Sequence, residues 1–246
     1  VHGVRAEPDY LVFLVQSETG YKNLSRLSSK AYLQTDGGET PRIGIADLRQ
    51  WGDGLICLSG GADGPLGKAL RAGQDDRARD LLTELDTIFR GRFYVELQRH
   101  GLPEQAACEN AMIDLAYEFD LPLVATNDVY FTDPNMHEAH DALLCIAQKQ
   151  TVNQADRRRL TAQHYFRSSL EMRDLFADIP ESLDNTLVIA RRCAYRVPLR
   201  DPILPKFDEG GEATTVLREE ARTGLEDRMH SQKMEIGSDQ AATYFE

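Results

Sequence analysis

The first half of the chain alternates between short apolar runs and longer amphipathic segments. Apolar runs at residues 10–16, 55–58, 93–97 and 121–126 have the length of strands and predict buried β-strands. Between them, apolar residues recur at helical spacing, which predicts helices at residues 21–33, 45–51 and 76–90 and from Pro103 onward. Strands and helices that alternate in this way are typical of an α/β fold with a parallel sheet or a barrel, and periodicity does not choose between the two.

The pattern changes after Phe131, where helical spacing replaces the alternation. Helices are predicted at about residues 135–150, from about residue 169, and at residues 181–197. Residues 198–212 are rich in Pro and Gly and predict a linker. A last helix carries Leu217, Ala221, Leu225 and Met229 on one face. The sequence therefore predicts an α/β body that ends in helices, then a linker and a further helix.

Two of the apolar runs end in side chains that are able to bind metals or move protons. The run at residues 93–97 contains Glu96 and leads to Arg99 and His100, and the run at residues 121–126 leads to Asn127 and Asp128. Parallel strands deliver the residues that follow them to one mouth of a sheet or barrel. We therefore expect His100 and Asp128 to lie at the same edge of the sheet.

Composition and charge narrow the class of protein. Of the 246 residues, 41% are apolar and 28% are charged, which is ordinary for a globular protein, and no apolar run is long enough to predict a membrane span. The formal net charge of −12 argues against this segment being the main phosphate-binding surface of a nucleic-acid-binding protein, although another domain is free to carry that surface. The four cysteines are far apart and are interpreted as buried free thiols of a cytosolic protein.

Several strings of the sequence, taken together and in order, resemble one known family. They are YLVFLVQSETGYKNLSRLSSKAY, GLICLSGGADGPLGKAL, YVELQRHGLPEQ with LAYEFDLPLVATNDVYF, HEAHDALLCIAQKQTVNQADR, YFRSSLEMRDLFADIPESLDNTLVIARRC, and LPKFD ahead of the last helix. This wording resembles the polymerase-and-histidinol-phosphatase (PHP) domain of the bacterial replicative DNA polymerase III alpha subunits, followed by the entry into the polymerase core.

The resemblance implies a fold and a division of the chain. The implied fold is a distorted, TIM-like β/α barrel of the PHP type, of which this chain would hold the later part, followed by a helical segment. Residues 1–200 would be the PHP domain without its N-terminal strands, and residues 201–246 the linker and first helices of the polymerase core. The start, VHGVRAEPDY, has no initiating Met, and we expect the chain to be a fragment of a longer protein.

The same resemblance implies the position of a metal site, and it also implies that two of the expected metal ligands are missing. Active PHP domains hold a metal cluster with His, Asp and Glu side chains, and His100 and Asp128 match ligand positions of the family. Tyr10 and Tyr130 stand where histidines are expected, and a neutral phenol is a poor ligand for Zn²⁺ or Mn²⁺. We therefore expect a vestigial site that binds these metals weakly or not at all, in which His100 and Asp128 hydrogen-bond each other and loop amides. The alternative is an active metal-dependent 3′–5′ exonuclease or phosphoesterase.

Three other motifs have simpler interpretations. His137 and His140 share one face of a helix but lack a third ligand, so a metal role is not expected. The loop SGGADG lacks the G-K-[ST] end of a P-loop and is interpreted as a strand-exit turn. The run Arg157–Arg159 is interpreted as a solvated arm rather than as a DNA contact.

The function implied by the resemblance is template-directed DNA synthesis by a longer, cytoplasmic protein. The chain has no D-x-D triplet, and two-metal phosphoryl transfer needs such carboxylates, so the Mg²⁺-binding palm is expected outside it and no polymerisation within it. DNA and deoxynucleotides would bind through that missing core. The other expected partners are replisome subunits, including the proofreading exonuclease. No association with a membrane is expected. An error-prone paralogue and a stand-alone sugar- or histidinol-phosphate hydrolase are the alternatives, and the LPKFD exit argues against the hydrolase.

Overall fold

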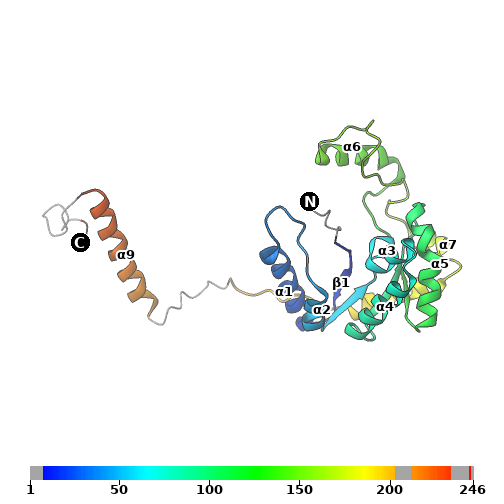
Figure 1. Ribbon diagram of the computed structural model, residues 1–246, viewed down its shortest axis with the longest axis horizontal. Coiled ribbons are helices and arrows are strands. Elements are labelled where there is room, and N and C mark those ends of the chain that lie inside the picture. Colours follow the sequence, from blue (N-terminus) through cyan, green and yellow to red (C-terminus); the bar gives the residue numbers. More distant parts are fainter. Residues whose placement is uncertain (1–7, 203–211, 234–243, 245–246) are drawn as a thin grey trace. The chain divides into compact units, whose positions relative to one another are not determined.

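A computed structural model of the protein describes residues 8–202, 212–233 and 244 (Figure 1). The chain divides into two compact units, Val1–Val197 and Pro198–Glu246. Among its described residues, the second unit contains the long helix α9 (Ala213–Ser231), which confirms the last predicted helix. The predicted linker has no helix or strand at residues 198–202 and 212, and the rest of it, including LPKFD, lies outside the described residues.

The first unit is built on a four-stranded sheet with the strand order β1-β2-β3-β4. The strands are β1 (Val12–Val15), β2 (Leu55–Leu58), β3 (Phe93–Leu97) and β4 (Leu123–Ala125), each within a predicted run. As predicted, β2, β3 and β4 are parallel. The expectation that β1 would join them in parallel was wrong, because β1 pairs with β2 in the antiparallel direction.

The contacts of α1 (Glu18–Gln34) give a physical reason for the reversed strand. The N–H of Gln16, just after β1, donates to the carbonyl of Gly54, just before β2, at 3.0 Å. Gly20 packs so closely on Gly54 that a Cβ at position 20 would lie 2.0 Å from that carbonyl oxygen. The helices between β1 and β2 therefore bring the start of β2 next to the end of β1, as a hairpin connection does. A parallel connection would instead carry the chain to the opposite end of the sheet.

The helices of the first unit follow the predicted order, with two differences. The helix α3 was not predicted, because its seven residues are too few for a periodic signal. The helix α8 ends at Arg192, five residues before the predicted end at residue 197. Besides α1, the helices of this unit are α2 (Ile45–Trp51), α3 (Pro65–Arg71), α4 (Asp75–Ile88), α5 (Pro103–Glu118), α6 (His137–Gln148), α7 (Ser169–Leu175) and α8 (Pro180–Arg192).

Both faces of the sheet are buried at β2, β3 and β4. One face packs on the helical layer that includes α3, α4 and α5 and carries Leu55, Cys57, Phe93, Val95 and Leu97. The opposite face, with Ile56, Leu58, Tyr94 and Val124, packs on Ile189 of α8. Burial on two sides explains why these strands are continuous apolar runs instead of alternating ones.

The two outer edges of the sheet differ. At β4 the edge is covered by α8, where the side-chain amide of Asn185 donates to the carbonyl of Leu123 at 2.8 Å. At β1 no further strand pairs within the described residues, so the sheet is open there and is not a closed barrel in this part of the chain. The observed fold is thus a mixed α/β architecture. None of the described helices is both long and apolar enough to cross a membrane.

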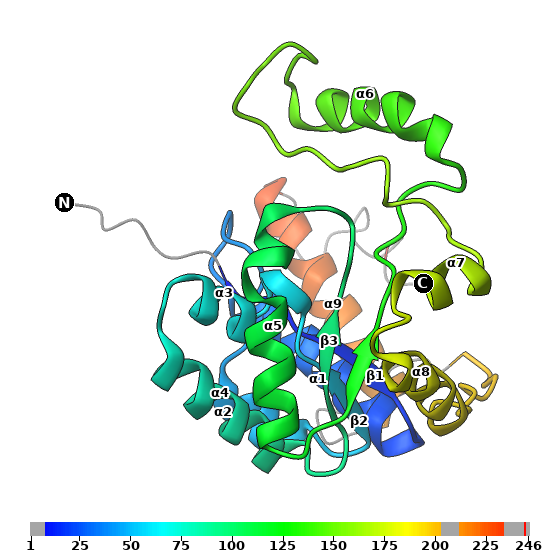
Figure 2. The ribbon, with the colours of Figure 1, turned by 90° about the vertical axis from the view of Figure 1, so that its right-hand side faces the viewer.

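A projecting segment, residues 129–166, is referred to here as the arm. It contains α6 and the loop that follows, and it stands clear of the sheet and its covering helices (Figure 2). Its two ends are joined by a parallel bridge between Phe131 and Tyr165, with the Phe166 N–H donating to the Phe131 carbonyl at 2.9 Å.

Candidate functional site

The candidate site lies at the edge of the sheet where β2, β3 and β4 end. Because these strands are parallel, His100 and Asp128 leave the sheet on the same side, as expected. Tyr10 joins them although it precedes its strand, since β1 is antiparallel and its first residue, Val12, pairs with Leu58 at the end of β2. The reversed strand therefore brings a third candidate position to this edge.

Glu96 is a buried carboxylate near the end of β3. Its oxygens accept hydrogen bonds from the Gly60 N–H at 3.1 Å, from the Gln98 amide at 3.3 Å and from the Thr126 hydroxyl. Burial raises the pKa of Glu96, and the three donors counteract this rise. Since Gly60 follows β2 and Thr126 follows β4, the Glu96 side chain joins the ends of three adjacent strands.

His100 is completely buried, and both of its ring nitrogens are hydrogen-bonded. The Gln105 side chain accepts from the His100 N–H at 2.7 Å through its oxygen, so its amide nitrogen donates to Nδ1 at 3.0 Å. Nδ1 is then the acceptor, which places the proton on Nε2, where it donates to Asn127 Oδ1 at 3.2 Å. Burial and the adjacent His164 ring lower the pKa of His100 to about 4, so the ring is neutral near pH 7.

The amide of Asn127 links His100 to the base of the arm. Its Oδ1 also accepts from Arg167 at 3.1 Å, and its Nδ2 donates to the Tyr165 carbonyl at 2.9 Å. The ring of His164 stacks on His100 with a centroid distance of 4.1 Å. His100 therefore holds together β3, α5, the end of β4 and the arm.

Asp128 and Tyr130 lie at the surface and are not hydrogen-bonded to His100. Asp128 is exposed, and its charge adds to the rise in the pKa of Glu96 and partly offsets the fall that burial causes in the pKa of His164. The Tyr130 hydroxyl accepts from Arg158 at 2.8 Å, and its ring meets His140 and His164 edge-on. The expected hydrogen bond between His100 and Asp128 is absent from the described contacts, because Gln105 and Asn127 occupy both nitrogens of His100.

Arg99, the residue before His100, anchors the end of β3 to neighbouring elements. Its guanidinium forms paired hydrogen bonds to the carboxylates of Glu109 and Asp178, at 2.6 to 3.0 Å, and lies over the Phe176 ring at 4.6 Å. Arg99 thus fastens the end of β3 to α5 and to the loop between α7 and α8. It is a structural residue in this arrangement.

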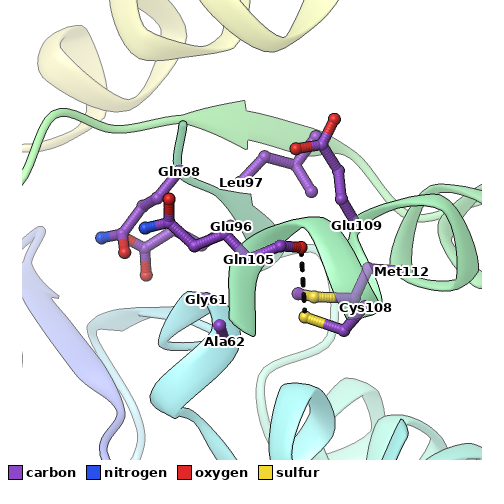
Figure 3. A pocket seen from close by; sticks show the side chains of 9 residues that line it. All are labelled: Gly61, Ala62, Glu96, Leu97, Gln98, Gln105, Cys108, Glu109 and Met112. Atoms are coloured by element: carbon purple, nitrogen blue, oxygen red, sulfur yellow. Dashed lines mark hydrogen bonds between the residues drawn. The ribbon is translucent and has the colours of Figure 1, made fainter. Parts of the chain in front are cut away.

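A small cavity beside Glu96 is shown in Figure 3. Its volume is about 10 Å³, enough for one water molecule and far too small for a nucleotide. In the close-up, the side chains of Gln98 and Gln105 extend toward Glu96, while Cys108 and Met112 lie at the opposite end. The cavity does not provide a substrate pocket. Its lining residues are Gly61, Ala62, Glu96, Leu97, Gln98, Gln105, Cys108, Glu109 and Met112.

Comparison with known proteins shows which proteins this chain is similar to. Residues 2–100 match the family model of the PHP domain. Over 221 residues the chain is 51% identical to the DNA polymerase III subunit alpha of Caulobacter vibrioides, a match that covers 89% of this chain and 19% of that protein. The subunit alpha of Escherichia coli K12 is 39% identical over 225 residues, covering 91% and 19%, and that of Rickettsia bellii is 37% identical over 233 residues, covering 92% and 20%.

The chain is homologous to bacterial DNA polymerase III alpha subunits. It spans about a fifth of the length of these relatives. This homology bears out the resemblance seen in the sequence, and the PHP match over residues 2–100 includes Tyr10, Glu96 and His100.

The described residues do not fit the metal cluster of an active PHP domain. No group of three or more His, Cys, Asp or Glu side chains in the described part of the chain is arranged to hold a metal ion. A zinc site needs at least three protein ligands, each with a free lone pair directed at the ion. His100 lacks one, since Nδ1 accepts from Gln105 and Nε2 carries its proton toward Asn127. Asp128 and its tyrosine neighbours do not supply the remainder.

The three remaining sequence motifs are structural in the described residues. His137 hydrogen-bonds the Leu160 carbonyl through Nε2 at 2.8 Å, inside the arm. In the SGGADG loop, Gly60 has a left-handed φ of 81°, and a Cβ there would lie 2.1 Å from the Tyr10 carbonyl oxygen, which confirms a strand-exit turn. The interpretation of Arg157–Arg159 as solvated was wrong for Arg157, whose side chain is only 3% exposed and pairs with Asp141.

Two residues of the His100 network had no signal that we recognised in the sequence. Gln105 follows Pro103 in the first turn of α5, where a polar side chain is usually exposed, yet it is buried against His100. Arg167 is buried as well and comes from beyond the arm. Only the tertiary structure brings it next to Asn127, 40 positions earlier in the chain.

Proposed function

We propose that the 246 residues are a segment of the catalytic alpha subunit of a bacterial DNA polymerase III, which carries out template-directed DNA synthesis in the cytoplasm. The observation that supports this is identity of 37–51% over about nine-tenths of the chain to alpha subunits of three bacteria. DNA, deoxynucleotides and catalytic Mg²⁺ would bind to a palm outside the segment. The barrel would be completed, and residues 201–246 continued, by parts of that longer protein.

Primer extension tests this assignment. The 246-residue chain alone should not extend a primed template, because it lacks an acidic triplet that can hold two metal ions. The full-length protein that contains it should extend the primer in the presence of Mg²⁺. Extension by the pure segment, or none by the full-length protein, would contradict the assignment.

Within that subunit, we propose that this region is a scaffold without hydrolytic activity. The geometry of His100 supports the proposal, because both ring nitrogens are used within the protein and its pKa of about 4 is set by burial. Without a metal-bound water there is no nucleophile for phosphodiester cleavage. As a scaffold, the region would connect the polymerase core to other replisome subunits, of which the proofreading exonuclease is the one that the family resemblance implies.

An active metal-dependent exonuclease is the second candidate. The observation that favours it is the exposed Asp128 carboxylate, which lies near Glu96 and His164 at the strand-end edge of the sheet. Elemental analysis and nuclease assays on the intact subunit, prepared without its proofreading partner, separate the two candidates. We expect no stoichiometric metal and no nuclease activity. Stoichiometric Zn²⁺ or Mn²⁺, with an activity that Asp128→Asn abolishes, would establish the second candidate.

A further inference from the structure

The arm is a pre-formed element rather than a loose loop. Arg157 and Asp141 form a two-pronged ion pair that ties the loop after α6 back to the helix, and Arg157 also donates to the Val152 carbonyl at 3.2 Å. Arg159 donates to the Gln154 carbonyl at 3.0 Å. The inner face of α6 packs on this loop, which buries Cys145. The opposite face is therefore presented in a fixed position.

That outer face is an apolar stripe with no described partner. Met136, Ala139, Leu143 and Ile146 recur at spacings of three and four and so line one side of the α6 helix with its preceding turn. Met136 is 46% exposed, Leu143 61% and Ile146 74%, and Ala139 is exposed as well. A soluble protein seldom places several large apolar side chains together on a projecting helix unless that surface is covered.

The charges around the stripe indicate what kind of surface covers it. Between Glu138 and Lys149 the only ionisable side chains of α6 are His140, Asp141 and Cys145. Asp141 is neutralised by Arg157, and Cys145 is buried on the inner face. The outer face thus lacks charges that steer a soluble partner, and it has the composition of an interface core, where charged residues are depleted.

The size of the stripe argues for a partner in the same polypeptide. Four side chains on one helix expose on the order of a few hundred Å², whereas a stable complex between separate proteins buries about 800 Å² on each partner. A surface this small is sufficient when the covering element belongs to the same chain, because its effective concentration is then in the millimolar range, ~1 mM or more. The alpha subunits to which this chain is homologous are about five times its length, which provides such elements.

We propose that the α6 stripe, formed by Met136, Ala139, Leu143 and Ile146, is an intramolecular docking surface that an apolar face of the alpha-subunit polypeptide outside these 246 residues covers. This inference rests on the proposed function, since it requires the longer polypeptide. Through this contact the arm connects the PHP region to the rest of the subunit. The Arg157–Asp141 ion pair keeps the arm rigid.

Thiol labelling of the full-length subunit tests the proposal. Leu143→Cys and Gln148→Cys are made separately in a Cys193→Ser background, in which the other native thiols of the described residues are buried. The labelling rate at each position is followed by peptide mapping and compared with the rate in urea. Gln148 is the matched control, because it is exposed on the same helix but lies two positions beyond Ile146, on roughly the opposite side.

A covered stripe and an uncovered one give different rates. We expect position 143 to react at least about tenfold more slowly in the native subunit than in urea, and position 148 within about twofold of its rate in urea. Ile146→Asp should restore fast labelling at position 143, whereas Gln148→Asp should not. Equal rates at positions 143 and 148 would overturn the proposal.

Two further outcomes would also overturn it. Protection that rises with protein concentration would indicate a second copy as the occupant, and protection that appears only when another purified subunit is added would indicate a separate partner. Primer extension is measured on the same samples. If these extend primers while position 143 labels rapidly, the docking proposal fails and the polymerase assignment stands.

Discussion

At the scale of single residues, the position that most resembles a metal ligand acts as an internal connector. His100 has no exposed surface and uses its ring and its backbone N–H to hold Gln105 and Asn127. The buried Gln105 side chain forms two hydrogen bonds with His100, and the half-buried Asn127 side chain forms one. Removal of a buried partner costs the desolvation of the groups that remain, in addition to the lost packing.

His100→Ala should therefore lower the free energy of unfolding of the protein by about 2–4 kcal/mol, since it removes the ring that bonds the Gln105 amide nitrogen and Asn127 Oδ1 and opens a cavity beside His164. Chemical denaturation measures the change. His230→Ala is the matched control, because His230 is exposed on α9, and this variant should stay within about 0.5 kcal/mol of the wild type. A His100 variant as stable as the control would refute the connector role.

The pH dependence of stability provides a second test of His100. Its pKa is about 4 in the folded protein against 6.5 for the free side chain, so the unfolded chain binds the proton more readily. The histidine therefore opposes folding as the pH falls from 6.5 toward 4. The stability advantage of the wild type over His100→Ala should narrow by about 2 kcal/mol between pH 7 and pH 5. An advantage that is constant over this range would mean that His100 titrates normally in the folded state.

At the scale of elements, two features of the chain differ from a repeating β/α pattern. The first is β1, which is antiparallel because its helical connection returns to Gly54. The second is the arm, which interrupts the alternation after β4 and depends on a buried ion pair. Arg157 is the central residue of the arm, since its guanidinium contacts the helix and the loop at the same time.

Arg157→Ala should loosen the arm without unfolding the sheet. The half-buried Asp141 carboxylate then loses its cationic partner, and we expect the cost to fall on α6. Hydrogen exchange of the amides of α6 should become faster by at least about tenfold, while β2 and β3 should be unaffected. Arg159→Ala, in the same run, removes only a contact to the Gln154 carbonyl and should change exchange little. Equal effects of the two substitutions would contradict this role of the ion pair.

At the scale of the whole molecule, the open side of the sheet dominates the expected behaviour in solution. The strand β1 has no outer partner among the described residues, and Val12 on it is 40% exposed. Beside it lies a groove of about 620 Å³, lined mainly by apolar side chains that include Phe13, Leu24, Leu27, Ile43, Leu48, Leu81 and Leu85. Unpaired strand edges next to apolar surface promote association between chains.

The isolated chain should therefore associate and be poorly soluble. Val12→Lys should shift light scattering toward the monomer, because a lysine on an edge strand opposes pairing with another edge. The control is Val197→Lys, which adds the same charge at an exposed residue that is not in a strand. A monodisperse wild-type monomer would refute the expectation. If Ile146→Asp produced the monomer instead, association would occur through α6 rather than through β1.

The sequence by itself determined most of the elements and the resemblance to bacterial DNA polymerase III alpha subunits. Apolar runs and helical spacing place β2 and β3 at their observed bounds, Pro103 marks the start of α5, and the ordered strings carry the resemblance that the homology bears out. These features are local, because a strand or a cap is encoded by consecutive residues. The same reasoning brought His100 and Asp128 to one edge, since parallel neighbours end on the same side.

Only the tertiary structure decided the direction of β1 and the use of each polar side chain. An apolar run is the same in both directions, so only the folded chain, in which Gly20 lies against Gly54, shows that β1 is antiparallel. The hydrogen bonds of His100 come from Gln105 and Asn127, and those of Arg99 from Asp178, 79 positions away. Residue identity alone does not distinguish a histidine that binds a metal from one that stabilises the fold. The groups that occupy the two ring nitrogens distinguish them, and folding brings those groups together.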